Sequence, residues 1–188
     1  MEEIKQYFEQ MVTLSEQEWE IFSSKLIKRK FSKNSIIVKV GQKENYLSFI
    51  EKGIIRLSIP KDIDDITFDF GFAGNFVSAY QYFLAQEPCN YQVDAITDTI
   101  LRSVSYSDLQ DIYARTSIGN KIGRLASEGL FIKKSKREIS LLTQSAEERY
   151  LSLFEDAPHL LQNIPLKYIA SYIGITPQAL SRIRKRIS

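Results

Sequence analysis

The side chains best suited to chemistry lie near the C-terminus. Residues 159–188 contain five basic residues and no acidic one, whereas residues 1–158 contain 20 basic and 23 acidic residues. Polar side chains in this tail recur at the spacing of one helix face: Gln178, Ser181, Arg182 and Lys185, with Arg184 beside them. In the major groove of DNA, Gln can hydrogen-bond adenine and Arg can hydrogen-bond guanine. The charges alone also fit a solvated basic face on a C-terminal helix.

The residues around this face follow the order of a helix-turn-helix. Pro165 suits a helix start, and Gly174 suits a tight turn with a left-handed backbone. Thr176 is placed to cap a second helix whose first residue is Pro177. We expect the apolar side chains of both helices to face inward: Leu166, Ile169, Ala170, Leu180, Ile183 and Ile187. Thr176 and the free amide groups behind it are suited to hold a phosphate, so the pattern favours DNA binding over a solvated face.

Composition excludes several other classes of protein. One cysteine, Cys89, cannot form an intramolecular disulfide, and one histidine, His159, cannot build a His-rich zinc site. No glycine-rich phosphate loop with Lys is present, and we predict neither an enzyme nor a bound metal or cofactor. The acidic N-terminus is unlike a signal peptide, and no apolar run approaches the roughly twenty residues of a membrane span. We therefore expect a cytoplasmic protein with no membrane partner.

The chain before the tail is predicted to be helical, then rich in β-strands, then helical again. Apolar spacing over residues 4–11 predicts one helix, and Ser15 with Glu18 predicts a capping box that begins a second. Short β-rich runs broken by turn residues follow, at 35–40, 46–50, 54–59, 67–72, 91–96 and 100–104. Such runs at near-regular spacing predict an antiparallel sandwich or barrel. A short helix over 109–114, capped at Ser107–Asp108, comes next.

A longer helix then carries apolar residues at intervals of four, three, four and three. These residues, here called the seam, are Ile118, Ile122, Leu125, Gly129 and Ile132. The spacing favours two helices paired in a coiled coil, and Gly129 would allow close backbone approach. The alternative is that the stripe packs on the β-rich part of its own chain. We expect Ser135–Arg137 to end or bend this helix, with another helix over 138–155.

The chain resembles the bacterial Crp/Fnr transcription regulators over nearly its whole length. The segments 146–150, 164–177 and 180–184 resemble short members of that family from Bacteroidetes. The resemblance implies an α+β fold: an N-terminal antiparallel β-roll (a double-stranded β-helix or jelly roll) flanked by helices, a long dimerisation helix and a C-terminal helical helix-turn-helix domain. It implies three regions: 1–106, a cyclic-nucleotide-binding-like effector domain; 107–136, the dimerisation helix and hinge; and 137–188, a DNA-binding domain without a wing. Without a wing, Lys167 becomes a candidate for contacts to the DNA backbone.

The resemblance also places an effector pocket in the roll. Its candidate lining residues are Gly74, Asn75, Phe76, Tyr80 and Tyr82, although aromatic residues such as these and Phe83 are more often core. Family members that bind cyclic AMP carry Gly-Glu-Leu and then Arg, but here Asn75 replaces the Glu and 86–92 contains no Arg. A buried cyclic phosphate without a charge-assisted donor is poorly held. We therefore predict that cyclic AMP does not control this protein.

The predicted function is that of a homodimeric, DNA-binding transcriptional regulator of the Crp/Fnr type. Its expected partners are double-stranded DNA, a second copy of the chain, RNA polymerase and an unidentified small-molecule effector. The alternative is a ligand-binding or protein-interaction module of cyclic-nucleotide-binding-like fold that does not bind DNA.

Overall fold

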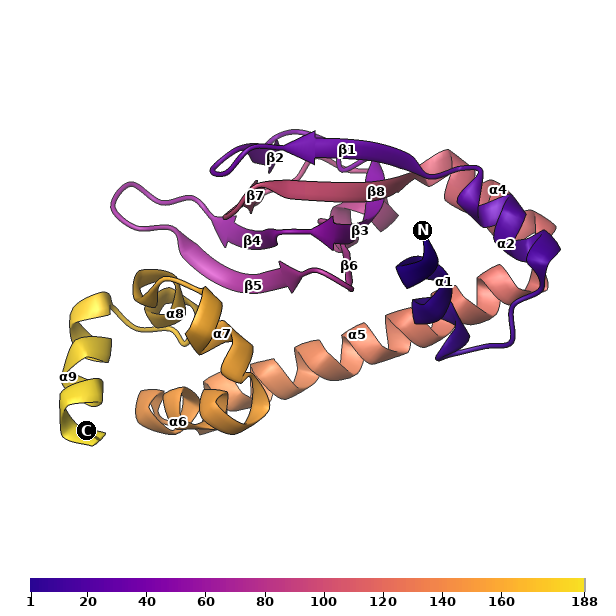
Figure 1. Cartoon of the computed structure of the whole chain (residues 1–188). Helices are drawn as coiled ribbons and strands as arrows, with labels where there is room; N and C mark the ends of the chain where they lie inside the picture. The colour runs from indigo at the N-terminus through magenta and orange to yellow at the C-terminus, as the bar shows by residue number, and fades with distance from the viewer. Residues whose placement is uncertain (188) are drawn as a thin grey trace. The chain divides into compact units, whose positions relative to one another are not determined.

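The computed structural model describes residues 1–187, which form two compact units (Figure 1). The first unit comprises Met1–Ser58 and Asp69–Glu128. The second comprises Ile59–Phe68 and Gly129–Ser188. We call Ile59–Phe68 the arm, because it leaves the strands of the first unit and belongs with the C-terminal helices. The α+β fold class predicted from the sequence is confirmed.

The first unit contains helices at both ends and strands between them. Its helices are α1 (Glu2–Glu9), α2 (Glu16–Ser23), α3 (Tyr80–Ala85), α4 (Tyr106–Arg115) and the first part of α5 (Ser117–Thr143). Its strands are β1 (Ile27–Phe31), β2 (Ile36–Val38), β3 (Tyr46–Lys52), β4 (Ile54–Ile59), β5 (Ile66–Phe72), β6 (Phe76–Val77), β7 (Gln92–Ala95) and β8 (Thr99–Ser105). The ends of β4 and β5 extend into the arm.

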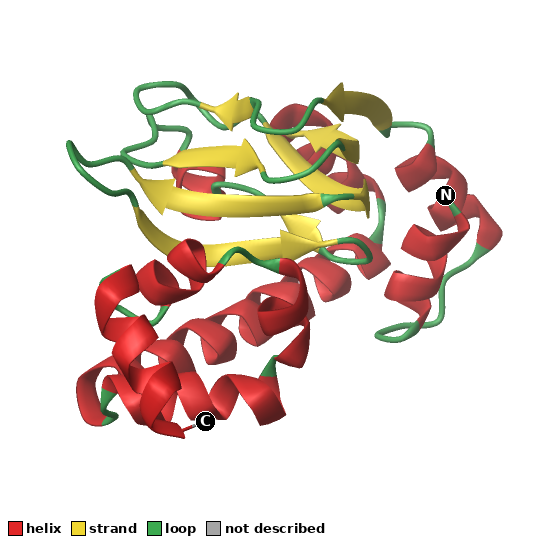
Figure 2. Cartoon of the chain, turned by 60° about the vertical axis from the view of Figure 1, so that its left-hand side comes forward, coloured by secondary structure: helices red, strands yellow, loops and turns green. Residues whose placement is uncertain are grey.

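The strands form two four-stranded sheets, drawn in yellow in Figure 2, with orders β1-β8-β3-β6 and β2-β7-β4-β5. The registers are antiparallel, with Ser48 opposite Ser103 in the first sheet and Arg56 opposite Asp94 in the second. The Ser48 and Ser103 hydroxyls are 2.8 Å apart and buried, so each satisfies the other. Strand β1 and strand β5 each lie at an edge.

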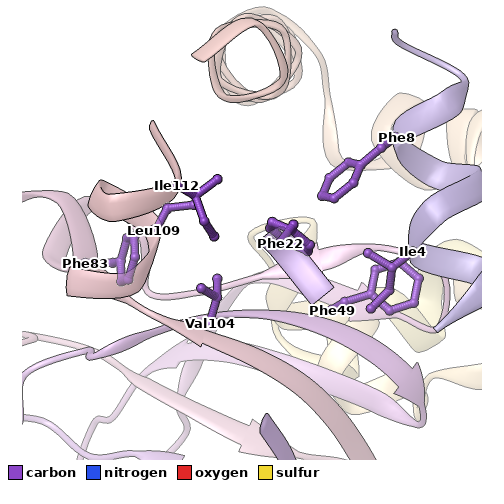
Figure 3. Close-up of a cluster of buried hydrophobic side chains, with 8 residues drawn as sticks. All are labelled: Ile4, Phe8, Phe22, Phe49, Phe83, Val104, Leu109 and Ile112. Atoms are coloured by element: carbon purple, nitrogen blue, oxygen red, sulfur yellow. The ribbon is translucent and has the colours of Figure 1, made fainter. Parts of the chain in front are cut away.

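One face of the first sheet packs against α1, α2 and α4. The cluster consists of Ile4, Phe8, Phe22, Phe49, Phe83, Val104, Leu109 and Ile112 (Figure 3). Phe8 contacts Phe22 edge-on, with ring centroids 4.8 Å apart. Burying several aromatic and aliphatic side chains supplies most of the driving force for such a unit, at roughly 1.5–3 kcal/mol per large side chain. The apolar residues that the sequence places at helical spacing near the N-terminus are thus core.

The N-terminal half of α5 is part of the first unit and packs against α4. A Cβ atom on Gly119 would lie 2.6 Å from Thr116 Oγ1, and one on Gly123 would lie 2.6 Å from Tyr113 Oη. Ile122 packs against the core cluster. For Ile122 of the predicted seam, packing within the chain is therefore the arrangement observed. The two glycines allow α4 to approach the α5 backbone.

The second unit is helical apart from the arm. It contains the rest of α5, then α6 (Ala146–Asp156), α7 (Pro158–Asn163), α8 (Leu166–Tyr172) and α9 (Pro177–Ile187). Helix α6 begins at a capping box in which Ser145 Oγ accepts the Glu148 amide hydrogen bond at 3.2 Å. Within residues 1–187, no helix is both long and apolar enough to cross a membrane.

Several predicted element boundaries are wrong. The break predicted at Ser135–Arg137 does not occur, because α5 continues to Thr143 and the next helix begins only after the Ser145 cap. Helix α4 is capped by Ser105 rather than Ser107, and begins earlier than predicted. Strand β1 was not predicted, because the three consecutive basic residues 28–30 interrupt the alternation of apolar and polar side chains. Charged residues of this kind are common on edge strands.

The predicted start of α2 is right. The capping box at the start of α2 is present: the Glu18 amide donates to Ser15 Oγ at 3.3 Å, and the Ser15 amide donates to the Glu18 carboxylate at 3.2 Å. This reciprocal pair satisfies two amide groups that a helix start leaves without partners.

Candidate nucleic-acid interface

Helices α8 and α9 are joined by the tight turn that the sequence predicts. Gly174 has φ +81°, in the left-handed region that favours glycine. The Gly174 amide donates to the Ser171 carbonyl at 3.0 Å, and the Ile175 amide donates to the Ala170 carbonyl at 3.0 Å. These hydrogen bonds satisfy the carbonyls at the end of α8 while the chain reverses. A helix-turn-helix is therefore present at this place.

Thr176 caps the second helix. Its Oγ1 accepts a hydrogen bond from the Ala179 amide at 3.2 Å, and its carbonyl accepts the Leu180 amide at 3.0 Å. Pro177 occupies the first helical position, where its missing N–H leaves no hydrogen bond unmade. The predicted start of the second helix is confirmed at the level of individual hydrogen bonds.

The inner face of the pair is mostly as predicted. Ile169, Ala170, Leu180 and Ile183 are buried. Leu166 is 42% exposed and Ile187 is 37% exposed, so these two predictions are wrong. Each lies at a helix end: Leu166 opens α8, and a side chain leans toward the N-terminus of its helix, beyond the body of α8. Ile187 is the last residue of α9.

The outer face of α9 is polar and exposed. The exposed side chains are Thr176, Gln178, Ser181, Arg182, Arg184 and Lys185. Gln178, Ser181, Arg182 and Lys185 share one face of α9, within an arc of about 100°, while Thr176 caps the helix and Arg184 lies beside that face. Lys167 is exposed at the start of α8, with its ammonium 4.8 Å from the Tyr168 ring centroid. Arg186, near the end of α9, forms an ion pair with Glu147 of α6.

Two arginines that the sequence analysis missed hold the end of α8. Arg137 of α5 donates from Nη2 to the Tyr172 carbonyl at 2.7 Å, and its guanidinium lies 3.9 Å from the Tyr172 ring centroid. Arg149 of α6 donates from Nε to the Ile173 carbonyl at 2.9 Å. Cations are stabilising at helix C-termini, where carbonyl groups point outward. The only signal in the sequence is the family-like segment 146–150, which contains Arg149 but does not reveal its target.

The candidate effector residues of the roll do not gather around one space. Gly74 (φ +87°) and Asn75 are exposed in the β5–β6 turn, where the Gly74 amide donates to the Ile50 carbonyl at 2.9 Å. Phe76 joins the aromatic cluster, stacked on Phe8 with centroids 5.6 Å apart.

The two tyrosines of α3 point to different neighbours. Tyr80 Oη is 3.1 Å from Ser127 Oγ of α5, within hydrogen-bond distance. Tyr82 is buried and contacts Tyr91 edge-on, with centroids 5.3 Å apart.

The second sheet contains a buried ion pair. Arg56 Nε on β4 lies 3.2 Å and 3.1 Å from the two carboxylate oxygens of Asp94 on β7. Ser58 Oγ and Gln92 Nε2 each donate to Asp94 Oδ1 at 3.4 Å. Side-chain exposure is 8% for Arg56 and 12% for Asp94. A guanidinium that is buried and paired in this way has its charge already balanced.

Comparison with known proteins finds one matching family and several solved structures of similar fold. Residues 28–116 match the family of the cyclic nucleotide-binding domain. Among solved structures, FixK2 from Bradyrhizobium japonicum is similar with a TM-score of 0.72 and 17% identity, covering 86% of this chain and 84% of that chain. The c-di-GMP-responsive global regulator CLP of Xanthomonas campestris is similar with a TM-score of 0.69 and 17% identity, covering 92% and 91%.

A protein from Eubacterium rectale assigned to the Crp/Fnr family is similar with a TM-score of 0.72 and 16% identity, covering 93% of this chain and 83% of that chain. A comparison with curated protein sequences finds no match. At these identities the similarity establishes the fold alone.

Proposed function

We propose that this chain, which has the fold of the Crp/Fnr regulators and a cyclic nucleotide-binding domain at residues 28–116, is a homodimeric, DNA-binding transcriptional regulator. The observation that carries the proposal is the exposed face of α9. Gln178, Ser181, Arg182 and Lys185 lie on it, while Leu180 and Ile183 are buried on the opposite side. A helix that is anchored on one face and presents Gln and Arg on the other can enter the major groove.

The starts of α8 and α9 and the exposed face of α9 have different roles in this proposal. Thr176 and the first amide groups of α9 face a phosphate, as does Lys167 at the start of α8. Gln178 and Arg182 read base edges, and Arg184 and Lys185 supply further positive charge. Phosphate contacts set the register on the duplex, and base contacts set the sequence preference.

The dimer is supported by apolar residues on the C-terminal half of α5. Phe131 is 73% exposed, Ile132 55%, Ile139 59% and Leu142 79%. At about 100° per residue, these four side chains lie within an arc of about 100° on the helix. Exposed apolar residues gathered on one face indicate a protein interface. Of the predicted seam, Gly129 and Ile132 lie on this open half, so we propose that a second copy of α5 packs there.

The roll is poorly suited to a cyclic phosphate. The Arg56 guanidinium is buried against Asp94, and 86–92 contains no Arg. A phosphate buried beside 86–92 would therefore find no charge-assisted donor in that segment. We expect no cyclic AMP binding in titration calorimetry, and tight binding with the nucleotide located in the roll would contradict this part of the proposal.

Duplex binding as a function of salt tests the DNA assignment. The full chain is titrated with a mixed-sequence duplex of about 30 base pairs, long enough for two half-sites about 34 Å apart. We expect steep loss of affinity as salt rises, because bound cations release counterions from the DNA. The double variant Arg182→Ala, Lys185→Ala should bind at least tenfold more weakly while remaining dimeric.

The matched control is Lys33→Ala, Lys39→Ala, which removes the same charge from exposed positions of the roll. Equal loss in both double variants would show only non-specific attraction. Unchanged affinity in Arg182→Ala, Lys185→Ala would refute the assignment of α9 and favour the alternative, a ligand-binding or protein-interaction module. Dimerisation is tested separately by sedimentation of Ile132→Glu, Ile139→Glu against the control Val40→Glu, a 51% exposed apolar residue of the roll.

A further inference from the structure

Ser171 connects the arm to the helix-turn-helix through two hydrogen bonds. Ser171, in the last turn of α8, donates from Oγ to the Asp65 carbonyl at 2.9 Å. The same oxygen accepts a hydrogen bond from the Thr67 amide at 2.8 Å. Residues more than one hundred positions apart in the sequence are thus joined by one hydroxyl, whose donor and acceptor are both used.

The chemistry of an edge strand explains why a hydroxyl fits here. Strand β5 lies at the edge of its sheet, so the groups on its outer side have no neighbouring strand. The carbonyl of residue 65 and the amide of residue 67 point to the same side of an extended chain, as one partner strand would require. Ser171 satisfies this donor and this acceptor in place of a strand. Thr67 is only 1% exposed, so its amide is shielded from water.

A second contact holds the arm to α5. The Lys134 ammonium lies 5.5 Å from the centroid of the Phe68 ring, next to Thr67. Arg137 and Arg149 bind the carbonyls of Tyr172 and Ile173, the two residues that follow Ser171. The end of α8 is therefore held by the arm, by α5 and by α6. Gly174 and the start of α9 come directly afterwards.

We propose that Ser171 is a positioning residue for the recognition helix, and that the arm relays changes in β4 and β5 to α9 through it. Both ends of the arm continue into these strands, so a shift of either strand moves Asp65 or Thr67. Because the hydroxyl binds both residues, such a shift breaks or re-forms the contact at the end of α8. The relay deepens the proposed function, since it names the route by which the roll acts on the DNA-binding helix.

The test uses the full chain and three variants. Ser171→Ala removes both hydrogen bonds, and Ser171→Thr keeps the hydroxyl and should restore them. Ser140→Ala is the matched control, because its hydroxyl, in the same unit, bonds only locally to Gln144 Oε1 at 2.5 Å. Amide exchange measured by NMR without DNA reports on the contact, and duplex affinity at several salt concentrations reports on DNA binding.

We expect the Thr67 amide to exchange about tenfold faster in Ser171→Ala, the change expected for losing a hydrogen bond of ordinary strength. Amides of the turn at Gly174 and of the first turn of α9 should also exchange faster. Duplex affinity should fall about three- to tenfold with an unchanged salt slope, since no phosphate contact is removed. Ser171→Thr and Ser140→Ala should behave like the unaltered protein.

An unchanged Thr67 exchange rate in Ser171→Ala would overturn the proposal. So would faster Thr67 exchange with no change in either the α9 amides or the duplex affinity, since the contact would then position nothing. If the unaltered chain binds no duplex, the proposed function fails. The exchange experiment still decides whether Ser171 couples the arm to α9.

Discussion

Substituting the glycines of α5 by alanine tests how the two halves of this helix are packed. A Cβ atom on Gly123 would lie 2.6 Å from Tyr113 Oη and 3.0 Å from Tyr113 Cζ, whereas one on Gly129 would meet no described atom within 4 Å. Replacing glycine by alanine inside a helix stabilises it by about 1 kcal/mol. Gly129→Ala should therefore raise the free energy of unfolding of one chain by about 1 kcal/mol.

Gly123→Ala should behave in the opposite sense. The added methyl group displaces the Tyr113 ring, and overpacking costs about 1–3 kcal/mol. After the helix-propensity gain, we expect a net destabilisation of about 0–2 kcal/mol. Urea unfolding followed by circular dichroism measures both variants, and repeating it at two protein concentrations separates folding from dimerisation.

Gly129→Ala also tests the proposed dimer. If two α5 helices approach closely at Gly129, a methyl group there should weaken dimerisation by about 1–3 kcal/mol, or about 5- to 150-fold in Kd. An unchanged or tighter dimer would refute close approach at Gly129. Destabilisation of the single chain by Gly129→Ala would contradict the open surroundings of Gly129.

Three further predictions concern buried polar groups. In the described part of the chain, Thr67 Oγ1 is a buried side-chain oxygen with no hydrogen-bond partner, so Thr67→Val should stabilise the protein by about 1 kcal/mol in urea unfolding; destabilisation would contradict this. Arg56→Leu should cost about 3–5 kcal/mol because it leaves Asp94 buried without its cation, while Arg56→Leu, Asp94→Leu should cost clearly less; equal losses would show that the pair is not the cause. Burial raises the pKa of Tyr113 to about 12. The pKa of this hydroxyl in the unfolded chain is about 10. As the pH rises above about 10, Tyr113 therefore ionises in the unfolded chain before it ionises in the folded one. The free energy of unfolding should therefore fall by about 1–2 kcal/mol between pH 10 and 12, because solvent screens part of the effect at a half-buried ring. Tyr113→Phe should remove that part of the alkaline loss.

Much of the candidate interface could be predicted from the sequence. The turn at Gly174, the cap at Thr176 and the burial of Leu180 and Ile183 are all observed. Each depends on residues within about one helical turn of one another, where steric and hydrogen-bond preferences act locally. The exposed set on α9 follows directly, because side chains opposite a buried stripe face solvent.

The fold class could be predicted from the sequence, but the presence and bounds of some strands and helices could not. Alternating β-rich runs indicated the strands, yet β1 was missed because charged side chains cover an edge strand. The continuation of α5 through Ser135–Arg137 was also missed. No strong helix breaker lies there, and helix ends without Pro or a cap depend on the neighbouring packing.

By itself, the sequence determined where the charges lie, which face of α9 is open and how the helix-turn-helix is built, since these follow from short-range periodicity and capping. Only the tertiary structure decided that Ile122 packs inside its own chain while Phe131 and Ile139 remain exposed. It alone joined Ser171 to the arm and placed Arg137 at the end of α8. Such contacts form between segments far apart in the chain, and no local preference of Ser or Arg specifies which distant backbone group it will meet.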